Sequence, residues 1–134
     1  MAVKEQRDRM TISSMETFFD RLLRGKVTDT LFFGDLPVNV SQKWKEIVVV
    51  DCGNPMRNKG VFTSGTVLIY IYARQNAYGL KDVATMQKAE QLLSDAIDAN
   101  DDPHYHTSIS GSYANFDAIN DMYFNIIQVD LVIT

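Results

Sequence analysis

The regular pattern of apolar residues starts after a short charged segment. Residues 1–11 carry charges of both signs, so we expect a charged N-terminal arm followed by a single domain over 12–134. Ser13 and Glu16 have the spacing of a capping box, which predicts that the first helix begins at Ser13. Gly25 fits the left-handed position that ends many helices. Between them, apolar residues recur at three- and four-residue intervals, as the buried stripe of a helix requires: Met15, Phe18, Phe19, Leu22 and Leu23.

Two apolar runs in the middle of the chain predict strands. Glu46–Cys52 contains an unbroken aliphatic run, which is typical of a strand buried on both faces. Thr66–Arg74 is longer, and its side chains must alternate between two faces. We expect the first face to pack under helices and the second, which is aromatic and amphipathic, to meet a partner. The first face carries Val67, Ile69, Ile71 and Ala73, and the second carries Leu68, Tyr70, Tyr72 and Arg74.

The second half of the chain predicts one helix and two more strands. A helical stripe runs through Leu80–Ala99, and Pro103 lies beyond its end. A short strand over His104–Ile109 and a long one over Tyr123–Ile133 follow, with a turn or bulge at Gly111. The predicted fold class is therefore α+β, with a mixed or antiparallel sheet of about four to five strands and two main helices packed on one face. The stripe of the helix comprises Val83, Met86, Ala89, Leu93, Ala96 and Ile97.

Composition and charge narrow the class of protein. The chain has 134 residues, which fits one domain, and 46% of them are hydrophobic. Its net charge is −4, which argues against a nucleic-acid binder because phosphate contacts need a basic surface. The N-terminus lacks the apolar stretch of a signal peptide, and no run is long enough to span a membrane. These features predict a soluble protein of the cytoplasm.

Candidate chemistry is sparse. His104 and His106 follow Asp101 and Asp102, and imidazole with carboxylate is a ligand set that divalent metals accept. The carboxylates precede the strand in a loop, so a solvated loop and strand edge is the favoured interpretation, and the sequence leaves the metal site open. Cys52 is the single cysteine and is expected to be a buried structural residue, since no base is apparent beside it. We expect no catalytic residues and no cofactor.

Charged and aromatic side chains suggest contacts with other proteins. Asp101 and Asp102 belong to an acidic group that either caps a helix end in solvent or contacts a basic partner. A basic face with an aromatic residue could also form, an arrangement that suits single-stranded nucleic acid, from Lys43, Trp44, Lys45, Arg57 and Lys59. Because the net charge is negative, a core or interface role for Trp44 is favoured. The candidate protein interface consists of Trp44, Arg57, Lys59, Leu68, Tyr70, Tyr72, Asp101 and Asp102.

Over roughly residues 12–134, the chain resembles the tail terminator, or tail-completion, proteins of long-tailed bacteriophages. The likeness rests on the order of elements and on several local phrases. A first helix ends in Arg24-Gly25, and the chain then reaches Gly34-Asp35-Leu36-Pro37. The strand of residues 46–50 and the long strand of residues 65–74 follow, and Gly79-Leu80-Lys81-Asp82 leads into a helix that contains Leu92-Leu93. The last strand is Tyr123–Leu131.

The resemblance implies a structural role in virion assembly. Similar proteins form a ring, commonly a hexamer, that caps the tail tube, stops its polymerisation and faces the head connector. A ring requires two different contact patches on each subunit. The implied partners are other copies of the chain, a tail tube protein and a head-connector protein. The implied location is the bacterial host cytoplasm during assembly and then the neck or tail of the virion.

Two other functions remain open at the level of sequence. A small-ligand or regulatory module with a ferredoxin-like α+β fold would use the same long strand and helix. A hydrolase or metal enzyme would depend on His104 and His106. Ligand bound between sheet and helix would favour the first of these alternatives. Loss of an activity on replacing both histidines would favour the second.

Overall fold

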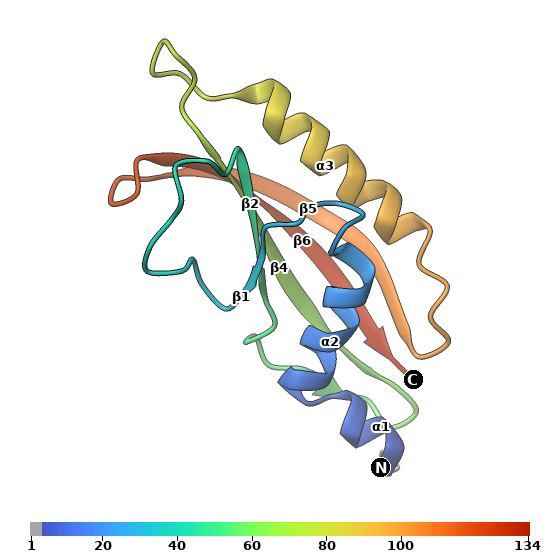
Figure 1. Cartoon of the computed structure of the whole chain (residues 1–134). Helices are drawn as coiled ribbons and strands as arrows, with labels where there is room; N and C mark the ends of the chain where they lie inside the picture. The colour runs from blue at the N-terminus through green and yellow to red at the C-terminus, as the bar shows by residue number, and fades with distance from the viewer. Residues whose placement is uncertain (1–3) are drawn as a thin grey trace.

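The computed structural model describes residues 4–134, which fold into three helices and a six-stranded mixed sheet (Figure 1). This confirms the predicted α+β class, with a mixed sheet and helices packed against it. The elements in chain order are α1 (Lys4–Arg9), α2 (Ile12–Leu23), β1 (Leu31–Phe33), β2 (Glu46–Asp51), β3 (Arg57–Asn58), β4 (Thr63–Arg74), α3 (Val83–Asp98), β5 (Tyr105–Asp117) and β6 (Met122–Ile133).

The sheet has the strand order β1-β2-β4-β6-β5, and the short strand β3 pairs with the start of β4. Only β1 and β2 are parallel, and all other neighbours are antiparallel. β4 and β5 both run antiparallel to β6, so they are parallel to each other with β6 between them. The unit β4–α3–β5 is therefore a split βαβ unit. The sixth strand, β3, is two residues long and pairs with Thr63 and Ser64 of β4.

Helices α2 and α3 cover the same face of the sheet, called here the helix face. The stripe predicted for α2 is buried along its whole length. It packs in one core with Ala89, Leu93 and Ile97 of α3. On β4, the residues predicted to face the helices are almost completely buried, with exposures between 0% and 1%: Val67, Ile69, Ile71 and Ala73.

The opposite face of the sheet, called here the open face, is covered only in part. Parallel strands need a crossover connection, and residues 34–45 make this one between β1 and β2. The crossover runs over the open face, where the Arg74 guanidinium donates to the Ser41 carbonyl oxygen at 3.0 Å. A smaller core forms beneath it. Its buried members are Ile47, Val49, Tyr72 and Met122, and Phe32, Leu36, Val40, Trp44, Tyr70 and Phe124 pack around them.

The charged N-terminal segment includes a helix that is attached to the sheet. Within α1, the Gln6 side-chain amide is buried and donates to the Thr63 hydroxyl and the Ile133 carbonyl oxygen, both at 3.3 Å. The next helix begins at Ile12, because Thr11 is its N-cap and accepts from the Ser14 backbone N–H. The predicted start at Ser13 was wrong by one residue.

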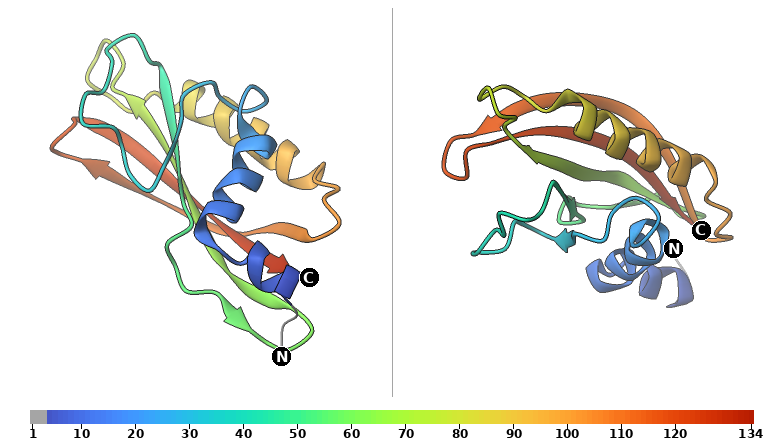
Figure 2. Two further views of the ribbon diagram at one scale, coloured as in Figure 1. Left: turned by 60° about the horizontal axis from the view of Figure 1, so that its bottom comes forward. Right: turned by 45° about the horizontal axis from the view of Figure 1, so that its top comes forward.

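The hairpin of β5 and β6 is long, and β4 pairs with β6 along the whole length of that strand (Figure 2). We predicted that the first of its strands would end at Ile109, yet it continues to Asp117. The interruption at Ser110 and Gly111 is a β-bulge within the strand. Figure 2 also shows α1 and the C-terminus at one end of the molecule and the tip of the β5–β6 hairpin at the other.

Candidate interaction surface

The open face carries a group of aromatic residues that the crossover leaves partly uncovered. The ring of Phe124 lies 5.0 Å from that of Tyr72 and 5.9 Å from that of Tyr70. Tyr113 on β5 lies opposite Ile126 in the same register and is 49% exposed. Rings at these separations pack favourably against each other. We call Leu68, Tyr70, Tyr113, Phe124 and Ile126 the aromatic surface.

Carboxylates surround the aromatic surface. Asp51 lies opposite Leu68, and Asp130 lies opposite Thr66, so both share the open face with Tyr70. Asp117 lies at the hairpin end of β5, and Asp35 belongs to the crossover. Only one arginine on β4 shares this part of the face, and its guanidinium is already bonded to the crossover. The aromatic surface therefore has an acidic rim.

The pKa values of two tyrosines on the open face reflect their burial and the nearby carboxylates. Burial raises the pKa of Tyr72 to about 12, and the carboxylates of Asp117 and Asp35 add to the effect. The pKa of Tyr70 is also raised, by burial first and then by Asp51. Both phenols therefore stay neutral over the physiological pH range. Their contribution to a contact is apolar area, ring stacking and hydrogen bonding.

The structure brings together only part of the predicted interface. Leu68 and Tyr70 lie on the aromatic surface as expected. Tyr72 shares their face but is 7% exposed, because the crossover and its neighbours cover it. The Trp44 ring lies tilted against that of Phe32, with 5.5 Å between the ring centroids, at the edge of the smaller core. Sequence alternation identified the face, but it did not indicate which residues the crossover would cover.

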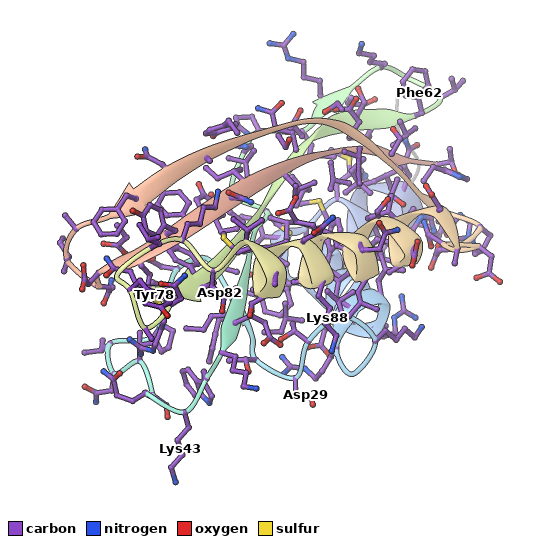
Figure 3. The ribbon with its side chains drawn as sticks, turned by 90° about the horizontal axis from the view of Figure 1, so that it is seen from above. Asp29, Lys43, Phe62, Tyr78, Asp82 and Lys88 are labelled. Atoms are coloured by element: carbon purple, nitrogen blue, oxygen red, sulfur yellow. The ribbon has the colours of Figure 1, made fainter. Side chains whose placement is uncertain are left out.

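Arg57 and Lys59 lie at the far end of the sheet from the hairpin tip. Arg57 is on β3 opposite Ser64, and Lys59 is in the turn that leads back to β4. Figure 3 shows Phe62, the residue immediately before β4, far from Tyr78 at the other end of the molecule. Val61 beside it is 83% exposed. We call Arg57, Lys59 and Val61 the basic hairpin.

Asp101 and Asp102 lie in a third place, the loop that follows α3. The Asp102 carboxylate accepts from the backbone N–H groups of His104 at 2.8 Å and Tyr105 at 3.0 Å. It also lies 3.8 Å from the Arg21 guanidinium. These bonds shape the connection into β5, so the side chain has a structural role that accounts for its position.

His106, one of the residues considered for chemistry, lies beside the last residue of the chain. The His106 imidazole Nε2 lies 3.3 Å from the Thr134 hydroxyl. Within residues 4–134, the side chains of His, Cys, Asp and Glu form no group of three that could hold a metal ion. Cys52 is buried, as predicted, and burial raises the pKa of its thiol to about 12. A thiol with so high a pKa is a poor nucleophile at neutral pH.

Sequence reasoning missed a pocket between α3 and the segment that follows α2. It has a volume of about 380 Å³, and Lys26, Lys45 and Lys88 line it together with Asp29 and Glu46. Figure 3 labels Asp29, which follows α2, and Lys88, which lies on α3. The lining residues come from three separate segments of the chain, so no local motif marks the pocket.

Sequence reasoning also missed a set of exposed apolar tips at the hairpin end of the molecule. The crossover, the connection from β4 to α3 and the turn between β5 and β6 all reach this end (Figures 1 and 2). The Gln75 side-chain amide donates to the Asp121 carboxylate at 3.1 Å and so joins two of these segments. The tips are Val38, Tyr78, Leu80 and Ile119, with exposures of 98%, 87%, 60% and 95%.

Comparison with known proteins gives no further assignment. No protein-family model matches the chain, and no curated protein matches it. In the described part of the chain, none of the helices has the length and apolar character needed to cross a membrane.

Proposed function

We propose that this chain is a structural virion assembly protein, a tail terminator that caps the tail tube through ring-forming contacts between copies. The observation that carries the proposal is the aromatic surface, a partly uncovered sheet face on an otherwise well-packed domain. Aromatic residues are enriched where proteins meet, because they supply large contact areas. Further support comes from the elements that underlie the resemblance, since the helices and strands named for it all form in this order.

A closed ring needs two different patches on each subunit, so that each copy contacts one neighbour through each patch. The chain offers distinct candidates at separate places: the aromatic surface on the open face and the basic hairpin at the end of the sheet. The exposed apolar tips at the opposite end provide a third surface. In the proposed role, this third surface is available to the tail tube protein or the head connector.

Self-association is the first test of the proposal. Sedimentation velocity and native mass spectrometry should show a closed oligomer, with a single dominant stoichiometry, as the protein concentration is raised. The same measurements should be repeated with an assembled tail tube protein, because the tube end is the proposed template. A chain that stays monomeric both alone and with assembled tubes would overturn the proposal.

Control of tube length is the second test. Tube protein allowed to polymerise with this chain should give shorter tubes in electron micrographs, with the added protein at one end only. A Tyr113→Ala variant should weaken the effect, while Lys88→Ala on the exposed side of α3 should leave it unchanged. Tubes of unchanged length at saturating amounts of the chain would count against a terminator.

The lysine-lined pocket favours a second candidate, a small-ligand or regulatory domain. Three lysines and a volume of about 380 Å³ would suit a small anionic ligand. The topology departs from a ferredoxin-like module, which contains two split βαβ units, since this chain has one. Anionic metabolites should raise the melting temperature, and Lys88→Ala should remove that rise, if this second function is correct.

A further inference from the structure

The two charged surfaces of the molecule complement each other. The rim of the aromatic surface is acidic, with Asp35, Asp51, Asp117 and Asp130 around half-buried rings. The basic hairpin presents two cations and an apolar side chain that is 83% exposed. Among the described residues, no ion pair joins either of its cations to a carboxylate. The basic hairpin therefore supplies the positive charge, and the aromatic surface supplies the negative charge and the aromatic rings.

We propose that the basic hairpin of one copy docks on the aromatic surface of the next copy, as the ring-forming contact of this protein. This inference rests on the proposed assembly function and names the two surfaces that it would use. The occupant of the aromatic surface is thus a second copy of this chain. The opposite charges of the two surfaces, and their separation on one molecule, support this contact.

The separation follows from the strand that links them. Ser64, which lies opposite Arg57, and Tyr70 are both on β4 and on the same face of the sheet. Six residues of an extended strand span about 20 Å. One copy can therefore use both surfaces at once, with a different neighbour at each. Such a head-to-tail contact forms a ring if its rotation closes.

The three side chains of the basic hairpin would each make a different kind of interaction in this contact. The Arg57 guanidinium can stack on a tyrosine ring, a contact that arginine makes more often than lysine. Lys59 would face the carboxylates of the rim. Val61 would add apolar area against Leu68 and Phe124. Because the pairs lie near solvent, the contact should weaken as salt is added.

Charge reversal provides the test. An end-reversed variant carries Arg57→Glu and Lys59→Glu, and a face-reversed variant carries Asp35→Lys and Asp130→Lys. Each should lower the association constant from sedimentation velocity by at least about tenfold, because like charges would then meet. The chain with all four changes should recover most of the lost association. A 1:1 mixture of the two variants should also assemble, since each then supplies the partner of the other.

Two controls keep the result interpretable. Asp95→Lys with Asp98→Lys reverses two exposed charges on α3, away from both surfaces, and should leave association unchanged. Tyr113→Ala removes a half-exposed ring without touching a charge and should also weaken association. Thermal unfolding of each variant shows whether it still folds. A folded end-reversed variant can decide the question even where the face-reversed one is unstable.

The outcomes separate this inference from the function on which it rests. Loss in both variants and recovery in the four-change chain supports the contact. The unaltered chain could instead associate, with charge reversal affecting association no more than the α3 control does. That result would overturn the proposed contact but would leave the assembly function standing. Absence of association by the unaltered chain, with and without tubes, overturns both.

Discussion

The two faces of β4 differ in how completely the rest of the chain covers them. On the helix face, Ile69 and Ile71 have no exposed area, since α2 and α3 pack over them. On the open face, Tyr70 is half-buried and Tyr72 lies under a crossover that has no regular secondary structure. The same strand thus stabilises the domain through one face and leaves contact area on the other.

This difference indicates which side chains of the sheet stabilise the domain and which are available for contacts with another molecule. A helix pair makes a close-packed core because its side chains interdigitate with those of the sheet. The crossover covers only the part of the open face near β2, so the cover ends before it reaches Tyr113. The residues beyond that edge are the ones that a neighbouring molecule can reach. Substitutions on the two faces should therefore have different consequences.

The largest effect is expected from Ile71→Ala on the helix face. The side chain is completely buried in the larger core, so its removal should lower the free energy of unfolding by about 2–5 kcal/mol. Denaturant unfolding of the purified monomer measures this loss. Leu68→Ala on the open face is the matched comparison, and an equal loss there would mean that the two faces are equally well covered.

Tyr72→Ala tests the smaller core. We expect a loss of about 2 kcal/mol, below that of Ile71→Ala, because the irregular crossover can relax into part of the space left by the ring. Denaturant unfolding again provides the measurement. A loss greater than that of Ile71→Ala would show that the smaller core is the more important of the two.

Periodicity predicted the helix face well. The stripe of α2 is buried throughout, and the residues of β4 were assigned to the correct faces. The stripe of α3 was wrong at its start, because Val83 is 60% exposed and the helix begins after the Asp82 cap. Alternation and helical spacing are local properties, so they can be read without knowledge of the partners in space.

The cover of the open face could not be predicted, because it depends on tertiary contacts that no local sequence pattern indicates. The crossover buries Leu36, Val40 and Trp44 at irregular intervals, and no periodic template detects such spacing. The strand beyond Ile109 is mostly polar, and β6 pairs with it along its length. The pocket and the exposed tips each combine distant segments. These features follow from tertiary pairing rather than from local pattern.

A moderate effect is expected from Asp82→Ala, which weakens the cover of the helix face. The Asp82 carboxylate accepts from the Thr85 backbone N–H at 3.1 Å and caps α3. Its loss should cost about 1 kcal/mol, while Asp82→Asn should retain most of the stability because asparagine is also a good N-cap. Thermal and denaturant unfolding should rank the three proteins in this order. An asparagine variant as unstable as the alanine variant would show that the charge itself is required.

Asp82 should also make the free energy of unfolding depend on pH in the acidic range. The hydrogen bonds from Thr85 lower the pKa of its carboxyl in the folded chain. The unfolded chain then binds the proton first as the pH falls, so the stabilisation is present above the unfolded pKa and is lost as the pH drops through the folded one. Asp82→Asn should show a shallower loss of stability in acid than the unaltered chain.

Tyr72→Phe should change the free energy of unfolding the least at neutral pH. At alkaline pH, however, this variant allows the two faces of the sheet to be compared. The pKa of Tyr72 is raised from 10.0 to about 12 on the open face, and that of Cys52 is raised from 9.0 to about 12 on the helix face. Each folded group keeps a proton that the unfolded chain has already released. The stabilisation is therefore complete below the unfolded pKa and is lost as the pH rises through the folded value.

Measurements of unfolding free energy against pH separate the two contributions. Tyr72→Phe should flatten the loss between about pH 10 and 12, and Cys52→Ala should flatten the part that begins near pH 9. The slopes should change independently, because the two groups lie on opposite faces of the sheet. An unchanged slope in Tyr72→Phe would mean that water reaches this hydroxyl in solution. The crossover would then cover the open face even less than its contacts indicate, and more of that face would be available to a neighbouring copy.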